Sequence, residues 1–231
     1  MDNSTLAWKQ FSNGQTPSTI QVDPSFYSLI RLGSKVLDFG CAWGRVSLEL
    51  QEKGYDVTGF DVNEAEIRRA QEFAQEANRK YKTQVRFDVA DIASEQGLSY
   101  TNNSFNVGLM HAFMGVLIDP AHRIRALEEA FRVLVPGGIL YMAEFAQDWE
   151  NPRCRERYER YIPMTGEKGT FIVTQDGTPN TPEIYRVHHY TRDELVALVN
   201  LKFFDKLTVK ETKFTSHHGN KINGLVVFAR K

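Results

Sequence analysis

Cysteine is scarce in this sequence, because the 231 residues contain only Cys41 and Cys154. Two thiols cannot form a zinc site by themselves, and a disulfide framework needs more cysteines. Long apolar runs are also missing, since none approaches the roughly 20 residues that cross a bilayer. Residues 1–5 carry neither the basic nor the apolar region of a signal peptide. We therefore expect a cytoplasmic protein in a reducing compartment, with no membrane partner.

An excess of either charge is absent as well. Lysine and arginine number 28, aspartate and glutamate number 29, and the net charge is -1. A nucleic-acid-binding protein needs a basic face, so nucleic acid is not the partner that we expect. The hydrophobic fraction of 42% and the charged fraction of 25% are those of a soluble globular protein. The length favours one domain with an elaboration.

Short apolar runs alternate with longer helical patterns from about residue 35 onward. We predict strands at residues 35–39, 55–60, 84–89, 105–110 and 139–144. Helices are predicted between them, including one whose apolar stripe runs from Ile124 to Leu134 and which ends at Pro136-Gly137-Gly138. Such alternation predicts an α/β fold with a doubly wound, mostly parallel sheet. Ligands of these sheets bind at the carboxyl ends of the strands.

The remaining part of the chain follows a different pattern. A helix is predicted from Thr191 to about Val199, followed by an antiparallel strand pair at 207–212 and 225–229. Residues 146–190, which we call the cap segment, exceed what the sheet requires. They contain a predicted hairpin, with strands at 170–175 and 184–190. We expect the cap segment to cover the carboxyl edge of the sheet.

A loop rich in small residues follows the first predicted strand, within residues 36–45 (VLDFGCAWGR). Gly40, Ala42 and Gly44 would let a ligand approach the backbone closely. The dinucleotide pattern G-x-G-x-x-G would require a third glycine at Arg45. The carboxylate of Asp38 would repel a pyrophosphate, whereas it would attract an ammonium and a sulfonium. The loop thus favours S-adenosylmethionine over NAD, although a tight turn in which Asp38 caps the helix is the alternative.

Two further acidic positions follow predicted strands. Asp61 ends the second strand, where a carboxylate can accept hydrogen bonds from both hydroxyls of a ribose. Helix capping is the alternative role, but Asn63 suits it better. Asp91 follows the third strand and can accept from an adenine amino group, while Ile92 packs on the ring. Taken alone, an aspartate after a strand is also a common turn residue.

Together, these motifs resemble those of the class I S-adenosylmethionine-dependent methyltransferases. Residues 36–45 resemble the first motif, and the later motifs follow in order at Asp61, at Asp91-Ile92, at 105–110 and at 132–138. Ala42 and Asn106 depart from the family pattern, which usually has glycine and aspartate there. The resemblance implies a seven-stranded sheet whose last strand is antiparallel, and S-adenosylmethionine as methyl donor, with S-adenosylhomocysteine as product and no metal. The implied cofactor-binding residues are Asp38, Gly40, Cys41, Ala42, Gly44, Arg45, Asp61, Val62, Asp91, Ile92 and Met110.

We expect one methyltransferase domain over residues 1–231. Its predicted parts are an N-terminal segment (1–33), a cofactor-binding core (34–145), the cap segment (146–190), and a last helix with the terminal strand pair (191–231). In the N-terminal segment, Trp8 and Phe11 either fold over the cofactor as a lid or pack loosely on the sheet.

Candidate catalytic residues are His111 and His189. Methyl transfer mainly requires alignment of the acceptor with the methyl group, and a base is needed only for a protonated nucleophile. His111 follows the fourth strand at the ligand edge, and His189 shares a hairpin face with Tyr185 and Val187. A loop position for His111 and simple packing for His189 are the alternatives. No histidine–carboxylate spacing suggests a metal site.

The sequence favours a small-molecule acceptor with an O, N or C nucleophile, and a monomer or homodimer. RNA or protein methylation is an alternative, but residues 110–113 (MHAF) replace the Asn/Asp-Pro-Pro-aromatic motif that positions planar amines. A non-catalytic S-adenosylmethionine-binding or scaffold protein is the third possibility. The charged run 153–160 could bind an anionic substrate, but a mixed-charge helix face with internal pairs is the preferred interpretation.

Overall fold

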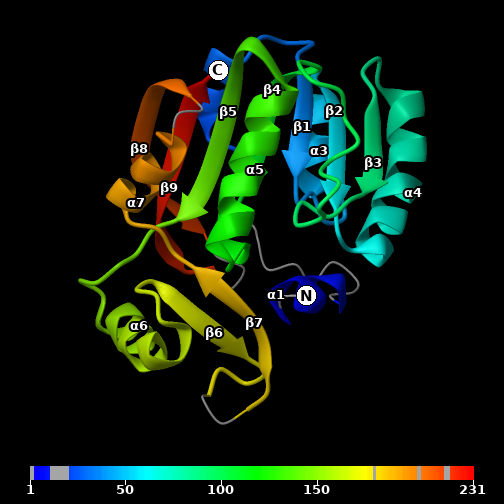
Figure 1. Ribbon diagram of the computed structural model, residues 1–231. Coiled ribbons are helices and arrows are strands. Elements are labelled where there is room, and N and C mark those ends of the chain that lie inside the picture. Colours follow the sequence, from blue (N-terminus) through cyan, green and yellow to red (C-terminus); the bar gives the residue numbers. More distant parts are fainter. Residues whose placement is uncertain (1–2, 11–20, 179–180, 202–203, 216–218) are drawn as a thin grey trace.

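The computed structural model describes residues 3–10, 21–178, 181–201, 204–215 and 219–231. Within them, seven strands form one sheet in the order β3-β2-β1-β4-β5-β9-β8 (Figure 1). The first five strands along the chain are parallel to one another, whereas β9 is antiparallel to both β5 and β8. This architecture confirms the predicted α/β fold and its antiparallel last strand.

The bounds of the elements follow the sequence pattern closely. The strands of the large sheet are β1 (Lys35–Phe39), β2 (Asp56–Asp61), β3 (Val85–Val89), β4 (Phe105–His111), β5 (Leu134–Phe145), β8 (Asp205–Thr215) and β9 (Lys221–Arg230). The helices around it are α2 (Pro24–Leu29), α3 (Arg45–Glu52), α4 (Glu64–Lys80), α5 (Pro120–Val133) and α7 (Arg192–Val199). A short 3-10 helix, η1 (Met114–Val116), follows β4.

Helices cover both faces of the sheet, and each face has its own apolar core. Side chains of α5 and α7 pack with Leu37 on one face, whereas side chains of α2, α3 and α4 pack with Val36 on the other. Neighbouring residues of one strand contribute to opposite cores because side chains alternate along a strand. Both Leu37 and Val36 are completely buried, as expected for a central strand of a doubly wound sheet.

The junction between α5 and β5 differs from the prediction. The helix ends at Val133, and Leu134 already pairs with Phe105 of β4, so Pro136 and Gly137 lie within β5. The register between the two strands shifts between Phe105 and Val107. Proline is tolerated at such an irregularity because it removes no regular ladder hydrogen bond. The proline-glycine signal therefore marked a bulge in a strand and not the end of a helix.

The cap segment contains α6 (Pro152–Thr165) and a hairpin of β6 (Thr170–Thr174) and β7 (Glu183–His188). Figure 1 shows it below the carboxyl ends of the large sheet, beside α1 (Asn3–Gln10). Its small core contains Tyr158, Tyr161, Phe171 and Ile172. The side chain of Asn151 accepts the first backbone N–H groups of α6 and so fixes where this helix begins. The division of the chain at residues 33, 145 and 190 stays a prediction.

None of the described helices combines the length and apolar character that crossing a membrane would require. Trp8 lies on α1, whereas Phe11, the other residue of the predicted lid, lies outside the described residues.

Candidate active site

A cavity of about 840 Å³ lies where the carboxyl ends of β1, β2, β4 and β5 face the cap segment. Every predicted cofactor residue except Gly44 and Met110 lines this cavity, and so do both candidate histidines. Trp8 of α1 lines it as well. One space therefore adjoins the loop after β1, the predicted catalytic residues and the cap segment.

The backbone of the loop after β1 is left-handed at three positions, with φ of 69° at Gly40, 48° at Ala42 and 83° at Gly44. A Cβ atom on Gly40 would lie 2.4 Å from Cδ2 of Phe113, so this glycine leaves no room for a side chain. A Cβ atom on Gly44 would meet the Phe87 ring at 2.5 Å. Gly44 is thus required for packing of the loop against β3 and does not line the cavity.

Asp38 lies at the end of β1 with only 2% of its surface exposed. Its carboxylate accepts a hydrogen bond of 2.7 Å from the Ser47 hydroxyl. Burial raises the pKa of Asp38 to about 7, against the opposing effects of the Ser47 hydrogen bond and the Arg45 charge. A cation beside Asp38 would stabilise its ionised form.

Asp61 ends β2 and is held by the backbone on both sides. Its Oδ2 accepts from the Ala42 N–H at 2.9 Å, and its Oδ1 accepts from the Asn63 N–H at 2.9 Å. Burial raises the pKa of Asp61, although these hydrogen bonds oppose the shift. Asn63 caps α4 with its side chain, as predicted. An ionised carboxylate offers about four acceptor positions, so Asp61 can still accept hydrogen bonds from a ligand.

The remaining predicted cofactor residues have mixed surroundings. Asp91 lines the cavity and forms an ion pair of 3.3 Å with Lys9 of α1. Ile92 lines the cavity at the edge of the apolar core. Met110 is completely buried in that core and does not line the cavity, because its side chain points to the α5 face of the sheet. The resemblance placed Met110 at the cofactor, and only the fold shows where its side chain points.

His111 is the last residue of β4, and 9% of its surface is exposed. Within the described chain, its Nε2 has no hydrogen-bond partner. Burial and the Arg45 charge lower the pKa of His111 to about 3, while a hydrogen bond with the Gln21 backbone opposes the shift. The imidazole is therefore neutral near pH 7. His111 lines the cavity, but its unpaired Nε2 is itself buried and is not exposed to that space.

His189 follows β7 and joins the cap segment to the cavity wall. A hydrogen bond of 2.9 Å links its Nδ1 to the Tyr158 hydroxyl. The Phe171 ring packs edge-on against it at a centroid distance of 4.9 Å. Burial, together with the Arg157 charge, lowers the pKa of His189 to about 3. His189 is thus a buried, tightly packed histidine whose lowered pKa favours the neutral form, and it also lines the cavity.

Glu144 of β5 is a cavity residue that the sequence analysis did not identify. Its carboxylate accepts the backbone N–H groups of Phe113 at 3.0 Å, Met114 at 2.8 Å and Gly115 at 3.2 Å. Burial raises the pKa of Glu144 to about 8, although the three hydrogen bonds oppose the shift. An acid at the end of an apolar strand was visible in the sequence, but its partners lie some 30 residues away.

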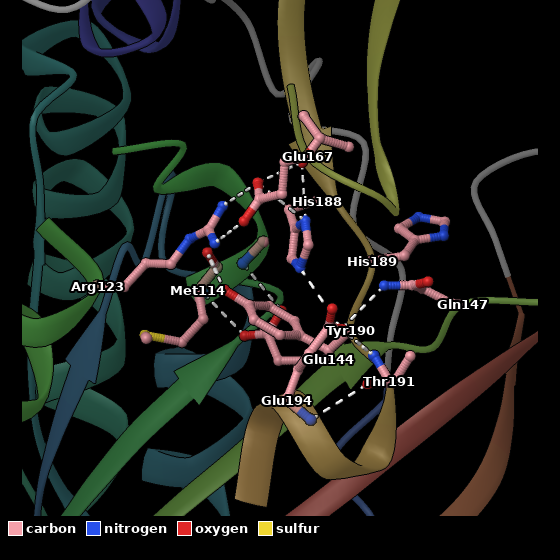
Figure 2. Close-up of polar contacts among 12 residues, drawn as sticks. Met114, Arg123, Glu144, Gln147, Glu167, His188, His189, Tyr190, Thr191 and Glu194 are labelled. Atoms are coloured by element: carbon pink, nitrogen blue, oxygen red, sulfur yellow. Dashed lines mark hydrogen bonds and ion pairs between the residues drawn. The ribbon is translucent and has the colours of Figure 1, made fainter. Parts of the chain in front are cut away.

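Figure 2 shows a second group of polar contacts, which joins the cap segment to α5 and η1. Arg123 of α5 donates to both carboxylate oxygens of Glu167, at 2.6 Å and 3.0 Å. His188 lies 3.2 Å from the same carboxylate, on the opposite side of the chain from His189. The Tyr190 hydroxyl donates to the Met114 carbonyl at 3.0 Å. These contacts attach the cap segment to α5 and η1 at the edge of the large sheet.

Comparison with known families agrees with this geometry. The family described as "Methyltransferase domain" matches residues 30–177. A solved S-adenosylmethionine-dependent methyltransferase from Methanosarcina mazei is 38% identical, with a TM-score of 0.81, over 92% of this chain and 99% of that one. The chain belongs to the class I S-adenosylmethionine-dependent methyltransferase family. The crystal structure of the [4+2]-cyclase SpnF has the same fold, with a TM-score of 0.62 at 18% identity over 88% of this chain and 77% of that one.

Curated relatives of this methyltransferase-family protein match shorter segments. A ubiquinone biosynthesis O-methyltransferase from Pseudomonas aeruginosa (strain UCBPP-PA14) is 32% identical over 48% of this chain and 44% of the relative. An S-adenosyl-L-methionine-dependent Diels-Alderase, iccD, from Talaromyces variabilis is 31% identical over 58% of this chain and 46% of the relative. The chain spans less than half of the length of these two relatives.

The residues of the site fit S-adenosylmethionine, the cofactor that the family implies. Gly40 lines the cavity, while a Cβ atom at this position would meet the Phe113 ring, so only glycine fits there. Burial raises the pKa of Asp38, and the ammonium and sulfonium of the ligand would favour its ionised form. Asp61 keeps acceptor capacity at the position suited to ribose hydroxyls.

Proposed function

We propose that this protein transfers the methyl group of S-adenosylmethionine to an O, N or C nucleophile of a small-molecule acceptor and releases S-adenosylhomocysteine. The observation that carries the proposal is the single cavity shared by the loop after β1, His111 and the cap segment. Donor and acceptor can therefore occupy one space, and in-line transfer needs little beyond their alignment.

Five residues would hold the cofactor. Asp38 would face the ammonium, Asp61 the ribose hydroxyls, and Asp91 and Ile92 the adenine, while Gly40 would let the ligand approach the backbone. When bound, S-adenosylmethionine supplies a methyl group that its sulfonium makes electrophilic.

His111 is suited to act on the acceptor. Its Nε2 lacks a hydrogen-bond partner within the described part of the chain, and its low pKa leaves the nitrogen able to accept a hydrogen bond from an acceptor hydroxyl or amine. Because Nε2 is buried, the His111 side chain would have to rotate toward the cavity before this atom could take the proton of the attacking nucleophile. The cap segment would exclude water and orient the acceptor.

The dimensions of the cavity and the relatives support a small acceptor. A volume of about 840 Å³ is that of a pocket for a cofactor and a small molecule. The name of the Pseudomonas aeruginosa relative specifies an O-methyltransferase of ubiquinone biosynthesis, which supports an oxygen nucleophile among the three possibilities.

The test is transfer of a labelled methyl group. Purified protein with methyl-labelled S-adenosylmethionine should label a component of a low-molecular-mass extract of the source cells, and label neither total RNA nor total protein. Label found only in macromolecules would contradict a small-molecule acceptor. Consumption of an extract component without transfer of label would contradict methyl transfer and favour the cyclase chemistry that the name of the Talaromyces relative describes.

A variant addresses the role of His111. His111→Asn keeps a polar group of similar size and should lower turnover on the identified acceptor about 100-fold or more, the usual contribution of a general base. Binding of S-adenosylhomocysteine should stay within about twofold. Unchanged turnover would remove His111 from the mechanism.

A further inference from the structure

One face of α6 lines the cavity, and this face is mainly cationic. Arg153, Glu156, Arg157, Arg160 and Tyr161 all line the cavity, at the i, i+3, i+4, i+7 and i+8 spacing of a single helical stripe. A helix that covers a cavity usually presents apolar side chains to it. The three arginines are exposed side chains that line the cavity, so a ligand in the cavity can contact them.

Internal pairing accounts for only part of this charge. Arg160 forms an ion pair of 2.5 Å with Glu156. Among the described residues, neither Arg153 nor Arg157 has an ion-pair partner. The mixed-charge helix that we predicted is therefore present, but its cavity-facing stripe keeps two unpaired positive charges.

The other acidic residue in this wall offsets only one of the two charges. Asp176 lies at the turn of the β6–β7 hairpin, and its carboxylate accepts hydrogen bonds from Thr178 and Thr181. It is thus engaged in holding the turn. The end of the cavity under α6 has a net positive charge, in contrast to the acidic end at Asp38 and Asp61.

A ring contact places Arg157 near His189, one of the two candidate catalytic residues. Its guanidinium lies over the Phe171 ring at 4.8 Å, and the same ring packs edge-on against His189 at 4.9 Å. The Arg157 charge contributes to the low pKa of His189, which agrees with this proximity. A guanidinium stacked on a ring keeps its N–H edges available for a carboxylate or phosphate.

Apolar and aromatic side chains form the wall next to these arginines. Phe171, Val187 and Tyr185 line the cavity from β6 and β7. Trp8 of α1 packs on Tyr185 at a centroid distance of 4.8 Å and also lines the cavity. Such a wall suits a flat apolar body, while the arginines suit an anionic group attached to it.

We propose that the end of the cavity under α6 binds an acceptor with a flat apolar body and an anionic group, a carboxylate or a phosphate, that is distinct from the methylated atom. Arg157 and Arg153 are the specificity-determining residues, and the aromatic wall holds the apolar body. That the bound molecule is a methyl acceptor rests on the proposed function. Binding of an anion at this site can be measured without turnover.

The experiment uses three matched probes: 2-naphthoate, 2-naphthyl phosphate and the neutral 2-naphthamide. Calorimetry measures their binding to the full chain, with and without S-adenosylhomocysteine. At least one of the two anions should bind about tenfold or more tightly than the amide, as expected for charge-assisted hydrogen bonds. The tighter of the two anions distinguishes a carboxylate from a phosphate site.

Variants then assign the effect to the arginines. Arg153→Gln and Arg157→Met should each reduce anion binding about tenfold while amide binding stays within about twofold. Methionine at 157 keeps apolar contact with the ring, so amide binding reports whether the pocket is intact. Arg155→Gln is the matched control, because Arg155 belongs to the same helix and does not line the cavity, and it should leave both affinities unchanged.

Some outcomes would overturn the inference. They are equal binding of anions and amide, no binding of either anion, or an anion preference that survives when Arg153→Gln and Arg157→Met are combined. Failure of the proposed function gives a different result, since an intact anion preference without any labelled methyl product would contradict methyl transfer and leave the anion site standing.

Discussion

Lowering the pH from 8 to 6 should weaken binding of S-adenosylhomocysteine about tenfold through Asp38. Burial raises the pKa of Asp38 to about 7. The ionised fraction of its carboxylate therefore falls from about nine-tenths at pH 8 to about one-tenth at pH 6. The ligand carries an ammonium, which only the ionised carboxylate attracts. If binding requires that form, the apparent dissociation constant rises in inverse proportion to the ionised fraction.

The stability of the ligand-free protein should change in the opposite direction. The pKa of Asp38 in the folded protein lies above its ordinary value, so folding favours the protonated form. This contribution to stability is complete below the unfolded pKa near 4 and is lost as the pH rises through about 7. Acidification within this window therefore stabilises the folded protein and weakens ligand binding. A general loss of structure would not produce these two opposite effects.

Calorimetric titration with S-adenosylhomocysteine at five pH values between 6 and 8 measures the effect. Asp38→Asn is the control, and its affinity should be low and nearly constant over this range. Ser47→Ala removes the hydrogen bond that stabilises the ionised carboxylate. The midpoint of its binding curve should therefore lie at higher pH than that of the wild-type protein. The same tenfold change in Asp38→Asn would show that another group titrates and would refute this account of Asp38.

The remaining predictions concern stability, measured by urea unfolding. Gly40→Ala should lower the free energy of unfolding by at least about 1 kcal/mol more than Gly137→Ala, because both have positive φ but a Cβ atom is obstructed only at Gly40. Equal losses would contradict the close contact. Arg123→Met should lower the free energy of unfolding by about 2–3 kcal/mol, because the carboxylate of Glu167 loses its bidentate partner. This loss is smaller than for a fully buried pair because Glu167 is about one-third exposed. Arg68→Met, which removes an exposed ion pair with i,i+4 spacing, should cost less than about 0.5 kcal/mol, and similar losses for the two arginines would show that the Arg123 contact contributes little.

Much of the fold and part of the candidate site could be predicted because their signals are local. The alternation of strands and helices, the turn after β1 and the capping of α4 by Asn63 each depend on residues close together in the chain. The acids at the strand ends could be found for the same reason, since parallel strands bring their carboxyl ends to one edge. Asp38, Asp61 and Asp91 therefore line one cavity, as expected.

Contacts between distant residues could not be predicted in this way. Glu144 binds the η1 backbone about 30 residues before it, and Arg123 pairs with Glu167 44 residues later. Nothing in the local pattern showed that Gly44 faces the Phe87 ring or that Met110 points into the core.

The sequence by itself determined the α/β fold, the order of its elements and the acidic residues at the strand ends, because periodicity, turn residues and charge act over a few residues. Only the tertiary structure decided which stripe of α6 faces the cavity, and with it the positive charge at the opposite end. A helix can present any side to its surroundings, and packing between distant segments selects the one that it presents.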